Sequence, residues 1–165
     1  MRPRRVRKPS HRVRHPLHRG DVFNPSRDEV RRFFCEAWSL RDGSRPVTPL
    51  QSIAIDWMAR HPEYHALLES GPAALEAEFS PQAGRENPFL HLSLHLSLVE
   101  QLQIDQPPGI RLAWQALVQS TQDEHEAAHR AIDALAQTLW EAQRDQTPPS
   151  NDRYLERLKR AAHGV

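Results

Sequence analysis

The chain has 165 residues, a net charge of +1 and one cysteine, and a chain of this length can bury one core. No apolar run is long enough to span a bilayer, and a lone cysteine cannot form an intrachain disulfide. The arginine-rich start lacks the continuous apolar stretch of a secretory signal. These features argue against membrane-spanning, disulfide-stapled and secreted proteins, and they favour a cytoplasmic location.

The first 22 residues differ from the rest of the chain in charge and composition. Residues 1–20 carry eight Lys or Arg residues and no acidic one, which leaves 14 basic against 21 acidic residues in the remaining chain. Three prolines and few apolar residues predict that residues 1–22 form a disordered basic arm. Such an arm is either a solvated tail, which we favour, or a contact for nucleic acid or another acidic partner.

Residues 23–163 are predicted to form a single all-helical domain, in which the first two helices have clear start signals. Ser26 and Glu29 form a capping box, and apolar residues at helical spacing follow it. Thr48 and Gln51 form a second box, with proline at the first helical position. Two helices are therefore expected to begin directly after these two capping residues.

Shorter elements are predicted in the next part of the chain. Pro62 begins a short helix that ends near Gly71. The following residues, 71–87, are rich in turn formers, and we expect about one helical turn in them, around residues 74–78.

The segment Phe89–Leu102 is open to two interpretations. Five leucines, from Leu90 to Leu98, alternate strictly with histidine and serine, which is the period of a β-strand. However, the segment is long, is rich in leucine rather than in β-branched residues, and follows a proline at a helix start. No partner strand is visible elsewhere in the sequence. We therefore predict a buried helix.

Three further helices are predicted toward the end of the chain. One begins at Ile110, and Thr121 and Glu124 form a capping box before the next and longest one. Ser150 then caps a final helix. The expected architecture is all-α, a compact bundle of about six or seven helices.

Histidines four residues apart occur three times in the chain. On a helix this spacing puts two imidazoles on one face, from which both can bind one metal ion. The second and third pairs lie on apolar faces of the two long predicted helices, whereas Pro62 interrupts the first pair. The pairs are His61/His65, His91/His95 and His125/His129.

We therefore predict a zinc or iron site between the two long helices. Two carboxylates close to the third pair in sequence, and the second histidine of the first pair, are possible second-shell groups. The alternative is a polar seam in which the histidines are hydrogen-bonded to protein groups. The predicted ligands are His91, His95, His125 and His129, and the possible second-shell residues are Glu126, Asp133 and His65.

The third pair also matches the helix motif of zinc hydrolases, HEAAH, with Glu126 in the position of the general base. A hydrolase needs a third ligand and an open position for water, and the sequence marks neither of them. Whether the protein is an enzyme therefore stays open.

Four stretches together resemble a bacterial family known as domain of unknown function 1841, over roughly residues 23–159. The resemblance implies a helical, cytosolic bacterial protein and brings no catalytic residue, since the family has none established. The family pattern begins at Val22, so the basic arm is either a genuine extension or the result of an upstream start codon. The stretches are FNPSRDEVRRFFCEAW (Phe23–Trp38), HPEYHALLE (His61–Glu69), GRENPFLHLSLHLSLVEQLQIDQPPGI (Gly84–Ile110) and LWEAQR (Leu139–Arg144).

Two hypotheses of function follow. The first is a histidine-rich bundle that binds a transition metal, which requires buried and converging imidazoles. The second is a non-catalytic protein-interaction module, in which the histidines are bonded to protein or solvent and an apolar patch is exposed.

Overall fold

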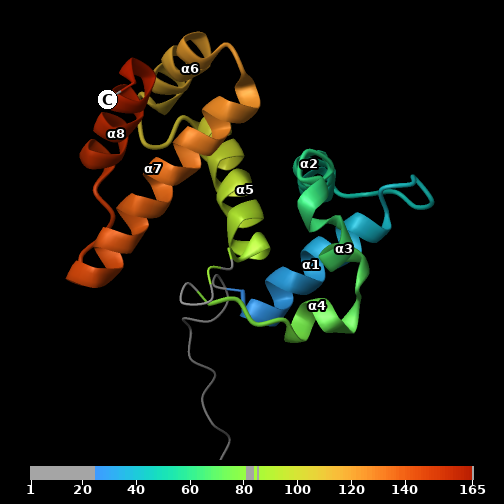
Figure 1. Cartoon of the computed structure of the whole chain (residues 1–165). Helices are drawn as coiled ribbons and strands as arrows, with labels where there is room; N and C mark the ends of the chain where they lie inside the picture. Colours follow the sequence, from blue (N-terminus) through green and yellow to red (C-terminus); the bar gives the residue numbers. More distant parts are fainter. Residues whose placement is uncertain (1–24, 81–83, 85, 165) are drawn as a thin grey trace, which may run out of the picture.

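The computed structural model describes residues 25–80, 84 and 86–164, and every regular element in these residues is a helix (Figure 1). The all-α prediction is confirmed, while the predicted arm, residues 1–22, lies outside the described residues. The elements are α1 (Arg27–Ser39), α2 (Pro49–Ala59), the 3₁₀ helix η2 (Pro62–Tyr64), α3 (His65–Glu69), α4 (Pro72–Glu76), α5 (Pro88–Ile104), α6 (Ile110–Thr121), α7 (Glu124–Asp145) and α8 (Asn151–His163).

Two of the three predicted capping boxes are present. The Ser26 hydroxyl accepts from the Glu29 N–H, and the Ser26 N–H donates to the Glu29 carboxylate; Thr48 and Gln51 make the same pair of bonds. The third box was wrong, because Thr121 is the last residue of α6 and its hydroxyl donates back to carbonyl oxygens of that helix. The carboxylate of Asp123 caps α7 instead.

The alternating leucine segment is helical throughout, as predicted. Alternate residues on a helix are about 200° apart, so an alternating pattern places leucines around the helix instead of along one face. This suits α5, which packs against α2 and α1 as well as against α7 and α6. The serines between the leucines need no outside partner, because Ser93 and Ser97 donate to carbonyl oxygens four residues earlier.

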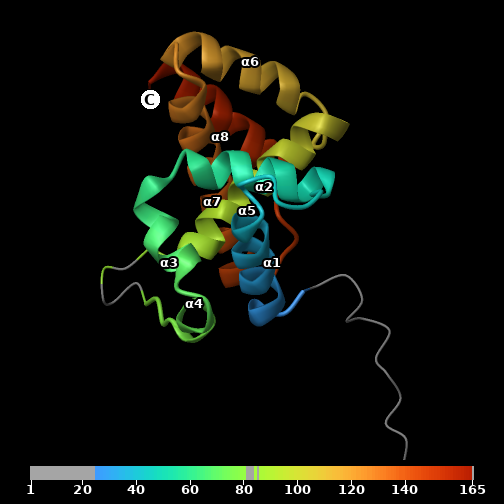
Figure 2. The ribbon, with the colours of Figure 1, turned by 90° about the vertical axis from the view of Figure 1, so that its right-hand side faces the viewer.

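Helix α5 lies between two groups of helices (Figures 1 and 2). Helices α1–α4 pack on one another, and so do helices α6–α8. Buried apolar side chains extend continuously from Phe34 in α1 to Leu158 in α8. None of the described helices is long and apolar enough to cross a membrane. The end of α2, the first half of α5 and the start of α7 meet beside this core.

Candidate metal centre

Four histidines converge where these three elements meet, and we call them the histidine quartet. One stands between α2 and η2, two lie in the first half of α5, and one lies in the second turn of α7. Their ligating nitrogens all lie within 4.8 Å of one another. The quartet consists of His61, His91, His95 and His129.

The local sequence explains how the first of these histidines is aimed. His61 is the N-cap of η2, and its own N–H donates to the Met58 carbonyl oxygen at the end of α2. Its Nδ1 lies 2.8 Å from the carbonyl oxygen of Trp57, one turn earlier. Both bonds tie His61 to α2, so its Nε2 points away from that helix and toward α5 and α7.

The Nε2 atoms of the quartet form a chain of short contacts. His61 Nε2 lies 3.1 Å from both His91 Nε2 and His129 Nε2, and His91 Nε2 lies 3.1 Å from His95 Nε2. Two nitrogens bound to one zinc ion at tetrahedral angles would be about 3.3 Å apart, given Zn–N bonds of about 2.0–2.1 Å. The observed contacts are therefore close to the edges of a zinc coordination tetrahedron.

The rings of the quartet also form a nearly regular tetrahedron. All six distances between their centroids lie between 4.8 and 5.3 Å. The centre of such a tetrahedron is about 3.1 Å from each ring centroid, and an imidazole bound to zinc through one nitrogen has its centroid at about 3.2 Å from the metal. The quartet therefore has the dimensions of a four-imidazole metal site.

The partners of the outer nitrogens determine the tautomers of two of these histidines. His61 Nδ1 faces a carbonyl oxygen, and His91 Nδ1 lies 2.8 Å from the carboxylate of Glu86, so both nitrogens must carry a hydrogen. In the neutral rings the two Nε2 atoms are then bare. Lone pairs therefore face each other across the 3.1 Å contact between His61 and His91. A cation between the two nitrogens would remove this repulsion, because both lone pairs could then bind the cation.

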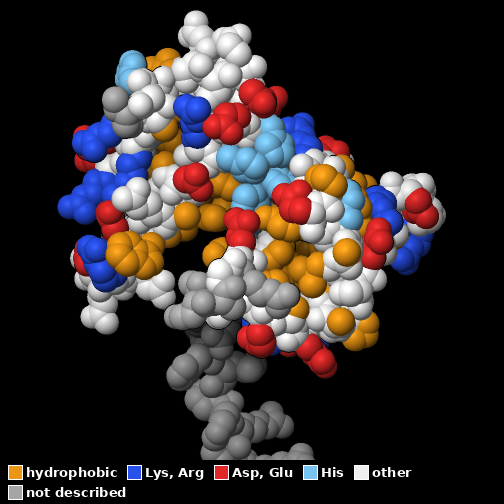
Figure 3. All heavy atoms as spheres, in the orientation of Figure 1, with side chains coloured by type: hydrophobic (Ala, Val, Ile, Leu, Met, Phe, Trp, Pro, Cys, Tyr) orange, Lys and Arg blue, Asp and Glu red, His pale blue; other side chains and the backbone are white. Residues whose placement is uncertain are grey.

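The deeper part of the quartet is closed to water. His61 and His95 are 1% and 0% exposed, and the indole of Trp57 stacks on His95 with ring centroids 3.9 Å apart. The side chain of His91 is 14% exposed. Figure 3 shows histidine side chains gathered in a patch on the surface, with acidic side chains beside it. The cluster is therefore buried on one side and reachable from solvent on the other.

Burial and neighbouring histidines favour the neutral form of three members of the quartet. Burial, followed by repulsion from the other rings, lowers the pKa of His95 to about 2. The same causes, burial first, lower the pKa values of His61 and His129. Neutral imidazole is the form that binds metals, so the site is prepared for ligation at neutral pH.

The stability of the protein in a chelator should therefore fall as the solution is acidified. Because the pKa of His95 is lowered in the fold, the unfolded chain takes up its proton first, at about pH 6.5 and below. Between about pH 7 and pH 5 this single group should cost about 2 kcal/mol of unfolding free energy. Urea unfolding at both pH values measures the loss, and His95→Gln should reduce the pH dependence. An unchanged midpoint in the wild type would contradict the burial of neutral histidines.

Three of the four predicted ligands, His91, His95 and His129, belong to the quartet. His125, the fourth, lies beside it: its ring centroid is 4.4 Å from that of His129 and 5.0 Å from that of His61, but 6.4 Å from that of His95. The fourth member of the quartet is His61, which was not among the predicted ligands. The sequence analysis did not select His61, because Pro62 follows it and interrupts the pair with His65. In the structure, His61 is the residue before η2, and its bonds to the end of α2 direct its ring toward α5 and α7.

The predicted second-shell residues do not contact the quartet through hydrogen bonds within the described part of the chain. His65 Nε2 lies 2.8 Å from the Met58 carbonyl oxygen, and its ring packs on Trp38. Glu126 forms an exposed ion pair with Arg130. Asp133 is exposed, and its charge acts on His129 only by raising the pKa of that ring.

Among the described residues, Glu86 is the carboxylate that is hydrogen-bonded to the quartet. One of its oxygens lies 2.8 Å from His91 Nδ1, and the other accepts from the Tyr64 hydroxyl at 3.0 Å. The Tyr64 ring in turn stacks on His61, with 5.4 Å between centroids. Burial and the charge of Glu86 raise the pKa of Tyr64, so its hydroxyl keeps its proton and holds the carboxylate in place. This is the carboxylate–histidine arrangement that orients metal ligands.

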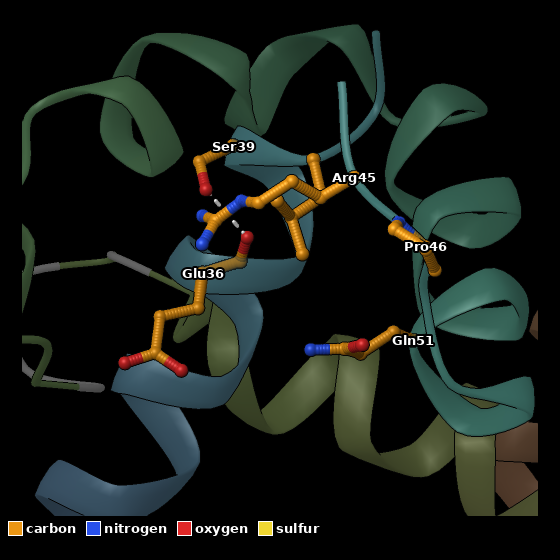
Figure 4. A pocket seen from close by; sticks show the side chains of 6 residues that line it. Glu36, Ser39, Arg45, Pro46 and Gln51 are labelled. Atoms are coloured by element: carbon orange, nitrogen blue, oxygen red, sulfur yellow. Dashed lines mark hydrogen bonds between the residues drawn. The ribbon is translucent and has the colours of Figure 1, made fainter. Parts of the chain in front are cut away.

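The hydrolase motif is not arranged as a hydrolase site. Its first histidine lies outside the four converging nitrogens, and its glutamate is paired with Arg130. A pocket between α1 and the loop before α2 offers no alternative centre (Figure 4). The groups that line it include Glu36, Arg45 and Gln51, and no cluster of metal-ligating side chains is found there among the described residues.

Comparison with protein-family models gives a match over most of the chain. The family model described as "Domain of unknown function (DUF1841)" matches residues 26–160. Neither a curated protein nor a solved structure matches the chain.

Proposed function

We propose that this chain, which belongs to the DUF1841 family, binds one transition-metal ion through the Nε2 atoms of the histidine quartet. The nearly regular tetrahedron of ring centroids is the observation that carries the proposal. The contact between the bare nitrogens of His61 and His91 supports it, because in the neutral, metal-free rings no hydrogen lies between these two atoms.

A hydrogen-bonded seam without metal explains only part of this geometry. His95 Nε2–H can donate to His91, and His129 Nε2–H can donate to His61, which accounts for two of the three short contacts. The contact between His61 and His91 is left without a hydrogen in the neutral rings. In addition, His95 Nδ1 is buried and has no hydrogen-bond partner among the described residues. A seam without metal therefore leaves the middle contact of this chain without a hydrogen, and one nitrogen of the histidine at one end without a partner.

The ligand set favours zinc, with iron as the second choice. Imidazole nitrogens bind zinc, copper, iron and nickel, and tetrahedral geometry is the preference of zinc. Four protein ligands fill a tetrahedral site, which is typical of structural zinc, whereas catalytic zinc keeps a position open for water. We therefore assign the ion a structural role rather than a hydrolytic one.

Titration with Co²⁺ tests this proposal directly. Untagged full-length protein, stripped with a chelator, should bind one equivalent of Co²⁺ with the strong visible absorption of a tetrahedral site, and one equivalent of Zn²⁺ should displace it. His163, an exposed residue on α8, supplies the control, since His163→Ala should titrate like the wild type. The absence of stoichiometric Co²⁺ and Zn²⁺ binding would overturn the proposal.

A further inference from the structure

The ligands of the proposed site come from both sides of the central helix. His61 belongs to the end of α2, in the group α1–α4, whereas His129 belongs to α7, in the group α6–α8. The remaining two ligands lie on α5 itself, between the two groups. One bound ion would therefore connect three parts of the fold that are far apart in sequence.

Direct packing between the two outer groups is sparse. Among the described elements, helices α1–α4 pack extensively only with one another, with η2 and with α5, and helices α6–α8 only with one another and with α5. Figure 1 shows this arrangement, with the two groups on opposite sides of α5. The side-chain contacts that join α2 and its end to α7 include the 3.1 Å contact of His61 with His129 and the ring contacts of His125 with His61 and Trp57.

We propose that the metal ion clamps the group α1–α4 to the group α6–α8, so that metal loading controls how firmly the two groups are held together. This inference rests on the proposed function of the quartet. Its basis is that the chain of Nε2 contacts crosses from one group to the other at a place with little other packing.

The physical chemistry of the quartet gives the clamp its dependence on metal. Without a cation, the bare nitrogens of His61 and His91 repel each other at 3.1 Å. Moving the end of α2 away from α5 and α7 relieves this repulsion and gives His61 access to water. With a cation, every Nε2 gains a bond, and His61 is drawn toward the other three rings. The three ligands on α5 and α7 can hold an ion without His61, so His61 alone decides whether the clamp closes.

Hydrogen exchange followed by mass spectrometry on the full chain tests the clamp. Saturating Zn²⁺ should slow amide exchange at least about tenfold in residues 56–64, at the end of α2 and in η2, and in the first turns of α7. Exchange in α6 and α8 should change by less than about twofold, because their packing does not involve the quartet. Calorimetry on the same samples establishes that the zinc is bound.

Two variants make the test specific. His61→Ala leaves three ligands, so at saturating Zn²⁺ it should keep the protection of α7 and lose that of residues 56–64. His163→Gln is the control, because this histidine is exposed at the end of α8, and the variant should behave as the wild type does. Equal protection of residues 56–64 by zinc in the wild type and in His61→Ala would overturn the clamp, as would bound zinc without any protection in the wild type. Failure of the wild type to bind zinc at all would overturn the proposed function, and the clamp with it.

Discussion

Replacing His61 by alanine should weaken zinc binding by more than about 100-fold, whereas the same change at His125 should weaken it by less than about tenfold. Loss of an outer partner that only orients a ligand typically costs about 10–100-fold in metal affinity, and loss of a ligand costs more. His61 supplies one of the four converging nitrogens, while His125 lies beside them. Competition for Zn²⁺ with a chromogenic chelator measures both affinities.

The pair of variants is informative because the two histidines are similar in position. Their ring centroids lie 5.0 Å apart, and the Trp57 ring lies 6.4 Å from that of His61 and 6.1 Å from that of His125. A general disturbance of the cluster would therefore affect both variants alike. Retained affinity in His61→Ala together with lost affinity in His125→Ala would show that the ligand set is the one predicted from the helical pairs.

The zinc affinity of Glu86→Gln should lie between those of the two histidine variants, because glutamine keeps a hydrogen-bond acceptor for His91 but removes the charge.

Zinc should raise the melting temperature of the protein by about 8–16 °C when its free concentration is about a thousand times the dissociation constant. Binding to the folded state alone then adds about 4 kcal/mol to the free energy of unfolding, and each kcal/mol moves the midpoint of a chain of this size by about 2–4 °C. Thermal unfolding followed by circular dichroism, with added Zn²⁺ and with a chelator, measures the shift.

Variants at the ligands supply the control for this shift. His95→Ala removes a fully buried member of the quartet, and the melting temperature of this variant should respond to zinc far less than that of the wild type. His163→Ala should keep the full response, since that side chain is exposed at the end of α8. An equal response in His95→Ala would place the stabilising zinc elsewhere on the protein.

The charge balance of the site bears on how the ion would be held. Four neutral imidazoles leave the charge of a divalent ion uncompensated within the ligand set, unlike thiolate or carboxylate ligands. The carboxylate of Glu86, bonded to His91, is a negative group in direct contact with the quartet. Because Glu86 is exposed, part of this compensation comes through solvent, which fits an ion near the surface rather than in the deep core.

The helices of this protein are determined largely by short stretches of sequence. Ser26 with Glu29, and Thr48 with Gln51, begin their helices through bonds between residues three apart, so the sequence alone was sufficient to place them. Where two such signals competed, at Thr121 and Asp123, sequence reasoning chose the wrong cap, because the outcome depended on where α6 ended. The spacing of His91 with His95 put both rings on one face of α5 for the same local reason.

The membership of the quartet was decided by the packing of helices against one another. His125 and His129 share a face of α7, and both approach the end of α2, but only His129 also lies close to both histidines of α5. Likewise, Glu126 and Asp133 are near the histidines in sequence, yet the carboxylate that meets them is Glu86, which is 5 residues from His91 and far from α7 in the chain. The spacing of residues along a helix determines which side chains share a face of that helix. A metal site also requires ligand atoms from separate helices to lie within a few ångströms of one another. Only the tertiary structure sets those distances.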